Sequence, residues 1–267
     1  MRQTNLVTSA FAVLGAMLIL FLAVPVAAMM LRESPGSLCS AFAEGEVRAA
    51  LWVSVGAAAI STAISAVLGV PLAYLLARTE FRGKTLVQAV VDMPVVVPHT
   101  VAGIALLTVL GPQGLFGGPA GRLGIRFVDA LPGTVAAMIF VSAPFLVNAA
   151  RAGFEAVNPR LEKVSRSLGA SPTRTFFRIS LPLAFRPIVA GAVMSWARAV
   201  SEFGAVLVIA YYPRVGPTLI YERFTSFGLG GSRPIAVLLL IVSIVFFIAL
   251  RTSAPEVKAT NGGVRGA

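Results

Sequence analysis

The sequence predicts an all-α integral membrane protein with six transmembrane helices. Hydrophobic residues make up 57% of its 267 residues, and charged residues only 12%. A soluble domain carries about twice that charged share, ~25%. The apolar residues gather into six long runs, and the Lys and Arg residues lie almost entirely between these runs. Helices are the expected form because a segment in lipid must satisfy its backbone polar groups within itself.

The six apolar runs define the predicted spans and one membrane domain. The spans cover approximately residues 6–31, 49–77, 86–110, 131–150, 188–211 and 235–250. The last run is short for the ~20 residues that cross a bilayer, so we expect its helix to extend into both flanks. The membrane domain is then residues 1–251, and the small polar segment 252–267 is expected to be a flexible tail.

The first run has two possible readings. It follows Met1 and Arg2, so it could be a retained span or the apolar part of a cleaved signal peptide. A signal peptide has an apolar region of about 7–15 residues, and this run is longer. The sequence therefore favours a retained first span.

Prolines interrupt two of the spans. The third contains Met93-Pro94 and Pro98-His99, and the fourth contains Pro144. Proline removes a backbone donor and kinks or breaks a helix, which membrane proteins tolerate where the helix packs in protein or lines a cavity. We therefore expect a broken third span inside a compact bundle, with small residues allowing close helix packing.

The basic residues predict the topology. Fourteen of them lie in alternate connecting segments and the termini, against seven in the other segments. This excess places both termini and the long loop 151–187 in the cytoplasm, because positive charge is retained on that side. The net charge of +11 lacks the aromatic-interleaved patch of a nucleic-acid-binding surface, so no nucleic-acid partner is expected.

Metal and redox chemistry are not expected from this composition. The single cysteine, Cys39, excludes an internal disulfide and a cysteine-cluster metal site. The single histidine, His99, excludes an HExxH metalloprotease motif. We predict no catalytic residue, no metal site and no cofactor in this chain.

The loop 151–187 begins with a predicted amphipathic helix. Asn158-Pro159 is a helix cap followed by a first-turn proline. Leu161, Val164 and Leu168 then recur at helical spacing and form one apolar stripe. Gly169 is a natural stop for this helix.

A second short helix is predicted after that glycine. Ser171-Pro172 repeats the cap, and Phe176, Phe177 and Ile179 supply apolar contacts. Periodicity alone leaves two interpretations open for the pair of helices. They could lie on lipid headgroups, or they could dock into a groove on another protein.

Residue order favours docking. In residues 161–182, LEKVSRSLGASPTRTFFRISLP, Gly169 is followed ten positions on by Ile179 and then by Leu181-Pro182. This order resembles the cytoplasmic EAA loop of the membrane subunits of ATP-binding-cassette (ABC) importers. One departure is that Lys163, Val164 and Ser165 stand where the family has Glu-Ala-Ala, with Glu162 one position earlier. The resemblance implies an ATPase-coupling surface made of Leu161, Glu162, Lys163, Val164, Ser165, Leu168, Gly169, Phe176, Ile179, Leu181 and Pro182.

Three further stretches resemble the permease subunits of molybdate/tungstate importers. They are VVDMPVVVPHTVAGIALL, FVDALPGTVAAMIFVSAPF and MSWARAVSEFGAVLVIAYYP. The SEFG sequence followed by Tyr-Tyr-Pro is most similar to the archaeal tungstate-type branch. The likeness covers about residues 50–250, and sulfate and thiosulfate permeases are close relatives of this group.

The resemblance implies a type I ABC importer permease fold and an alternating-access mechanism. It implies two copies of this chain, two ATPase subunits that use ATP and Mg²⁺, and an extracytoplasmic oxyanion-binding protein. The chain lacks the G-x-x-x-x-G-K-[ST] loop that cradles nucleotide phosphates. It would therefore form the pathway and leave ATP hydrolysis to its partner.

The fifth predicted span carries two charges. Arg198 and Glu202 are four residues apart and would share a helix face. Because a bare carboxylate repels an oxyanion, we favour a mutually neutralised pair that fixes packing near the gate over a direct substrate contact. The candidate gate and pathway residues are Thr100, Ser142, Arg198, Ser201, Glu202 and Phe203.

Several of these side chains have competing roles. The hydroxyls of Thr100, Ser142 and Ser201 could contact a passing anion or bond between helices. Asp92 is expected to cap the broken third span, and His99 to be a packed polar residue rather than a proton site.

Two functions of other classes fit the sequence less well. A membrane-embedded enzyme would need a cluster of polar catalytic groups at one membrane face, and the sequence shows none. A stand-alone channel would give no reason for the loop 161–182 and would conduct without ATP. The sequence does not separate tungstate from molybdate or sulfate, because the discriminating ligands belong to another chain.

Overall fold

The computed structural model describes residues 6–252, and this part of the chain is helical without strands. The tail predicted at 252–267 lies outside the described residues except for its first position. The elements are α1 (Leu6–Leu31), α2 (Pro35–Ala43), α3 (Gly45–Arg78), α4 (Lys84–Val96), α5 (His99–Leu110), α6 (Gly117–Arg122), α7 (Leu131–Ala156), α8 (Pro159–Ser167), α9 (Pro172–Thr175), the π-helix η1 (Phe176–Ser180), α10 (Leu181–Leu183), α11 (Phe185–Val200), α12 (Gly204–Ile209) and α13 (Gly216–Thr252).

The number of spans agrees with the six predicted runs. Within the described residues, α1, α3, α7 and α13 are each long and apolar enough to cross a membrane. Two bent pairs of helices raise the number to six if each pair is one span. These pairs are α4 with α5, bent by 117°, and the segment Pro172–Leu183 with α11, bent by 69°. The all-α membrane fold is therefore confirmed.

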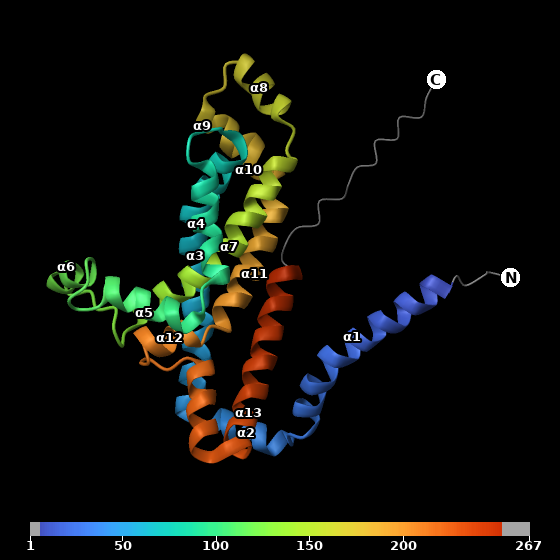
Figure 1. Ribbon diagram of the computed structural model, residues 1–267, viewed down its shortest axis with the longest axis vertical. Coiled ribbons are helices and arrows are strands. Elements are labelled where there is room, and N and C mark those ends of the chain that lie inside the picture. Colours follow the sequence, from blue (N-terminus) through green and yellow to red (C-terminus); the bar gives the residue numbers. More distant parts are fainter. Residues whose placement is uncertain (1–5, 253–267) are drawn as a thin grey trace.

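Helices α3, α7 and α11 form the centre of the bundle, and α13 packs beside them (Figure 1). Two glycines show how closely these helices approach. A Cβ atom added to Gly191 of α11 would come within 2.6 Å of the Ala149 Cβ, and one added to Gly69 of α3 within 2.8 Å of a Val147 methyl group. Both contacts are with α7, so the predicted close packing through small residues is present.

Helix α1 lies apart from this bundle. Figure 1 shows it projecting away from the other helices, connected through α2. None of the apolar window of this helix is buried within the chain, and residues such as Phe11, Ile19 and Phe21 are two-thirds exposed or more. The surface of α1 must therefore be covered by lipid or by another subunit.

The third span breaks at Pro98 rather than at Pro94. Helix α4 includes Pro94 and ends at Val96, and α5 begins at His99 after a turn. Pro98 has no backbone N–H, and it disfavours the helical conformation for Val97 before it. Pro94 does not end the helix, since α4 continues through it to Val96.

The fifth span differs from the continuous helix predicted for residues 188–211. Helix α11 ends at Val200, and a short turn of three residues leads into α12. Glu202 lies in this turn, where one of its carboxylate oxygens accepts a hydrogen bond from the backbone N–H of Ala205 at 2.8 Å. The side chain thereby caps the new helix and stabilises the break.

The last helix is longer than its predicted run, as expected. Helix α13 begins at Gly216, and the chain turns at Gly228, whose φ of 65° lies in the left-handed region that favours glycine. The second half then runs to Thr252, past both ends of the predicted 235–250 span.

Candidate coupling surface and translocation pathway

One end of the bundle carries α8, η1 and α10, and we call it the coupling end (Figure 1). The local sequence shapes α8 as predicted. The side-chain oxygen of Asn158 accepts a hydrogen bond from the Arg160 N–H at 3.0 Å, and Pro159 occupies the first turn. Gly169 has a φ of 84° and stops the helix. The backbone N–H groups of Gly169 and Ala170 donate to carbonyls of the last turn, which satisfies the helix end.

The apolar stripe of α8 faces outward. Leu161, Val164 and Leu168 are 47%, 56% and 83% exposed. A polar helix that presents three aligned apolar side chains to solvent resembles the anchor pattern of a helix that binds in a groove. We call these three residues the docking stripe.

We call α8, the Gly169 turn, α9, η1 and α10 the elbow. Its second half anchors it to the bundle. Ser171 caps α9 by accepting from the Arg174 N–H at 3.2 Å, and the chain then widens into a π-helix. The Phe176 ring lies 4.9 Å from the Tyr74 ring and 6.0 Å from the Phe154 ring, between centroids. The inward side chains of the predicted coupling surface are thus half-buried, namely Phe176, Ile179 and Leu181.

Glu162 has its partners within the chain. One carboxylate oxygen accepts from the Arg78 Nε and from the Ser180 hydroxyl, both at 2.9 Å, and the Tyr74 hydroxyl donates to the other at 3.4 Å. Arg78 also donates to the carbonyl of Val157 at 2.8 Å. Only 11% of the Arg78 side chain and 13% of the Glu162 side chain are exposed. This network, which we call the latch, ties α3 to α8 and η1.

The latch bears on the coupling surface that the resemblance implied. Glu162 is one of the residues of that surface, but its carboxylate is bonded to its own subunit. Lys163 is exposed beside it and Ser165 is half-buried, with its hydroxyl 3.1 Å from that of Thr175. The docking stripe and the basic side chains around it are therefore the outward features of α8.

A second polar cluster lies where the third and fifth spans break. Arg198 donates to Glu202 at 2.7 Å, so the predicted pair is present although it straddles the end of α11. Glu202 is 1% exposed, and Arg198 also lies 2.9 Å from a ring nitrogen of His99. His99 was expected to be packed, but its side chain is 48% exposed. We call these three residues the break cluster.

The other pathway candidates are scattered around the break cluster. Thr100 and Ser201 are exposed, Phe203 is half-buried against the ring of Tyr221, and Ser142 is fully buried in α7. The Ser142 hydroxyl therefore belongs to the bundle interior, away from any exposed pathway.

The role expected for Asp92 is wrong. Instead of capping a broken helix, this carboxylate lies in the middle of α4 and accepts from the Asn148 amide at 2.6 Å. The break occurs at Pro98, too far along the chain for Asp92 to reach the free N–H groups of α5. The side chain joins α4 to α7 instead.

The end opposite the coupling end is held by ion pairs that sequence reasoning missed. Arg214 bonds to Glu46 and Glu222, and Arg223 to Glu44 and Glu46. The pairs that involve Glu44 and Glu46 join the start of α3 to the start of α13 across more than 160 positions of sequence, which no local pattern reveals.

The corner between α1 and α2 is held in the same way. Arg233 of α13 donates to Glu33, and Ser37 also donates to this carboxylate at 2.7 Å. Both donors hold the pKa of Glu33 below its usual range, Arg233 with the larger effect. The contact is therefore present at neutral pH and is lost as the pH falls through that lowered value.

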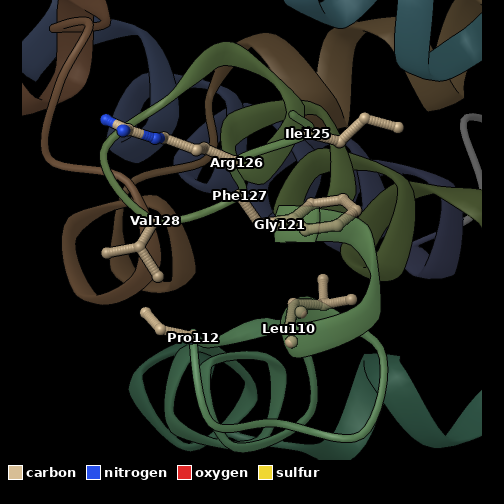
Figure 2. Close-up of a pocket in the computed structure, with 9 residues that line it drawn as sticks. Leu110, Pro112, Gly121, Ile125, Arg126, Phe127 and Val128 are labelled. Atoms are coloured by element: carbon tan, nitrogen blue, oxygen red, sulfur yellow. The ribbon is translucent and has the colours of Figure 1, made fainter. Parts of the chain in front are cut away.

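A cavity of about 360 Å³ opens within the Gly/Pro-rich connection between α5 and α7. Figure 2 shows Leu110 and Pro112 on one side of it and Ile125, Phe127 and Val128 on the other. Arg126 is the one charged residue in its lining. Among residues 6–252, no group of three or more His, Cys, Asp or Glu side chains could hold a metal ion.

Known proteins are similar to this chain in sequence and in fold. Residues 69–259 match the family model described as the inner membrane component of binding-protein-dependent transport systems. The chain is 44% identical to the molybdate/tungstate transport system permease protein WtpB of Pyrococcus abyssi, over 93% of this chain and 96% of that protein. It is 46% identical to the WtpB protein of Thermococcus kodakarensis, over 90% and 93%.

A solved structure supports the architecture. The bacterial ABC transporter involved in the import of the acidic polysaccharide alginate matches with a TM-score of 0.74 at 18% identity, covering 94% of this chain and 96% of that one. At this identity the likeness concerns the fold alone, and it is the type I importer permease fold that the loop 161–182 predicted. The chain is thus a multi-pass membrane transport subunit and not an enzyme, and it belongs to the family of inner membrane components of binding-protein-dependent transport systems.

Proposed function

We propose that this chain is the permease subunit of an ATP-driven importer of molybdate and tungstate. The observation that carries the substrate is the likeness to the two WtpB proteins, which extends over at least nine-tenths of the chain. The exposed docking stripe supports an ATPase partner, because the chain has no nucleotide-binding loop of its own.

The proposed assembly contains two copies of this chain in the cell membrane, two ATPase subunits at the coupling end and an extracytoplasmic oxyanion-binding protein. The exposed polar residues at mid-bundle support a second copy, because His99, Thr100 and Asp92 would be costly to place against lipid. The uncovered surface of α1 is available to lipid and to that copy. The excess of basic residues at the coupling end supports a cytoplasmic position for this end and for both termini.

The geometry suggests how ATP binding reaches the pathway. Closure of the ATPase pair would move α8 through the docking stripe, and the latch would carry that movement to α3. The elbow also continues through η1 and α10 into α11, which ends at the break cluster. A bundle with inward-open and outward-open arrangements would then respond to ATP through differential binding of its partner.

The first test uses proteoliposomes that hold this chain with its ATPase and binding protein. We expect tungstate and molybdate at low concentration to stimulate ATP hydrolysis and uptake, with sulfate inert. Stimulation by sulfate alone would keep the mechanism and reject the substrate. A chain that conducts anions without ATP, or never binds the ATPase, would reject the importer.

A charge-neutral substitution tests the role of the break cluster. Glu202→Gln should destabilise the subunit by about 2 kcal/mol, because Arg198 loses a charge-assisted hydrogen bond. Thermal melting in detergent measures this loss. We expect impaired assembly or coupling, with the order of preference among tungstate, molybdate and sulfate unchanged. A new order of preference would show that the carboxylate reads the substrate.

A further inference from the structure

Two helix breaks meet inside the membrane domain. Figure 1 shows α5 and α12 side by side, between the coupling end and the opposite end of the bundle. The contact is close, because a Cβ atom on Gly204 of α12 would come within 2.7 Å of the His99 Cβ. Arg198 lies thirteen residues beyond Phe185, about 20 Å along α11 at 1.5 Å per residue. The break cluster is therefore well inside the ~30 Å apolar layer of a bilayer.

The exposed part of this cluster is positive. The Glu202 carboxylate is 1% exposed, and both oxygens have donors, Ala205 N–H for one and Arg198 for the other. The Arg198 side chain is 21% exposed, and His99 is 48% exposed. The buried carboxylate thus holds the guanidinium in place without facing the open side. An ion that approaches the pair would therefore meet the Arg198 guanidinium and not the Glu202 carboxylate.

Helix α5 adds donors at the same place. Its first residues are His99 and Thr100, both exposed, and no side chain caps its start. The first N–H groups of a helix have no intrahelical acceptor, and the helix dipole makes this end positive. The His99 ring nitrogens lie 3.2 Å and 2.9 Å from the same Arg198 nitrogen, and Nδ1 is 3.5 Å from Glu202, so the ring helps to hold the guanidinium in place. Broken transmembrane helices direct such ends at anionic substrates in other transporters.

The cluster cannot face lipid at low cost. A charged side chain at mid-bilayer costs on the order of 3 kcal/mol even by the mildest scale. The nearest other charge on α4 is Asp92, which lies before the break and is bonded to Asn148. In the proposed assembly the open side of the break cluster would therefore face the second copy across an aqueous passage, where the exposed cation would favour anions over cations.

We infer that His99, Thr100 and Arg198 form a transient binding site for a tetrahedral dianion in the translocation pathway. The inference rests on the proposed function and adds the place where the permease itself contacts its substrate. The site offers the Arg198 guanidinium held by His99, the Thr100 hydroxyl and the first N–H groups of α5, a donor set that suits oxyanions of the tungstate class. A pathway site must also release its ion, which the neighbouring Glu202 charge favours.

Thr100→Asp separates this site from a structural role. At the second residue of α5 an aspartate is favourable for the helix, because it complements the dipole, so subunit stability should be kept. A negative charge beside Arg198 should nevertheless lower uptake of tungstate and molybdate tenfold or more in proteoliposomes of the full complex. Thr100→Asn has the size of the aspartate without its charge, so it isolates the effect of charge, and its uptake should exceed that of Thr100→Asp at least fivefold.

The outcomes separate the two proposals. If the unchanged complex transports none of the dianions, the proposed function fails, whereas transport of sulfate alone changes the substrate and leaves this test intact. Equal uptake by Thr100→Asp and Thr100→Asn would overturn the site. Loss of thermal stability in Thr100→Asp would also overturn it, because the carboxylate would then be disturbing packing rather than an ion.

A labelling experiment provides a readout without transport. In a Cys39→Ser background, Thr100→Cys places the chain's single thiol at the site. We expect an anionic thiol reagent to react about tenfold faster than a cationic reagent of the same size, and millimolar tungstate to slow it. Faster reaction with the cationic reagent would contradict the site.

Discussion

Leu168→Asp is expected to abolish stable association between this chain and its ATPase. Leu168 is the most exposed member of the docking stripe, at 83%, and it ends α8 beside the Gly169 turn. An anchor that fills a partner's groove contributes about 2 kcal/mol or more, and a buried unpaired charge adds a further penalty. We expect affinity to fall at least 30-fold, measured by co-purification and by titration of the detergent-solubilised subunits.

Two variants control this experiment. Leu168→Met keeps the apolar contact and should bind almost normally, since such swaps cost little. Phe81→Asp places the same charge on another exposed apolar residue, in the connection between α3 and α4 and off the stripe. If Phe81→Asp weakens association as much as Leu168→Asp, the stripe is not the docking surface.

Arg78→Ala is expected to uncouple ATP hydrolysis from uptake while the complex still assembles. The substitution leaves Glu162 buried without its cation, which costs about 3 kcal/mol for a largely buried pair. Because the docking stripe is untouched, ATPase binding should persist within threefold. Uptake per ATP hydrolysed should fall tenfold or more, because α8 would no longer be fixed to α3.

An exposed ion pair provides the matched control. Lys84 and Glu80 lie 2.7 Å apart near the same end, but the Glu80 side chain is 88% exposed. Such surface pairs contribute at most about 1 kcal/mol, so Glu80→Gln should leave the ratio of uptake to hydrolysis unchanged. If Arg78→Ala also leaves this ratio unchanged, the latch is structural and does not carry coupling.

Local patterns in the sequence predicted the features that depend on neighbouring residues. The cap at Asn158, the apolar stripe and the Gly169 stop all follow from the residues of one short helix and its two ends, and each is present. The broken third span followed from proline, which constrains its own backbone whatever surrounds it. The resemblance to ABC permeases rested on the residue order of the same loop, and the family model that matches residues 69–259 agrees with that resemblance.

The contacts that sequence could not supply join distant parts of the chain. The partners of Glu162 lie 84 and 18 positions away, at Arg78 and Ser180, and His99 and Arg198 are 99 positions apart. No periodicity encodes such pairs. Asp92 was misassigned for this reason, because its partner Asn148 belongs to another helix. The coupling and pathway roles themselves stay predictions until the variants are measured.

The π-helix between α9 and α10 has a consequence for insertions and deletions. Its five residues, Phe176–Ser180, follow a wider turn than the α-helices on either side, so the segment contains more residues per turn than its flanks. An i→i+5 turn accommodates about one residue more than the i→i+4 turn of an α-helix. Deleting one residue here should therefore let the segment close into an α-helix with both flanks near their present relative orientation. Forcing the same five residues into α geometry without a deletion should instead rotate one flank against the other by roughly 100°, the angle per residue of an α-helix. The wide turn thus takes up one residue of length and keeps α11 in phase with the helices before it.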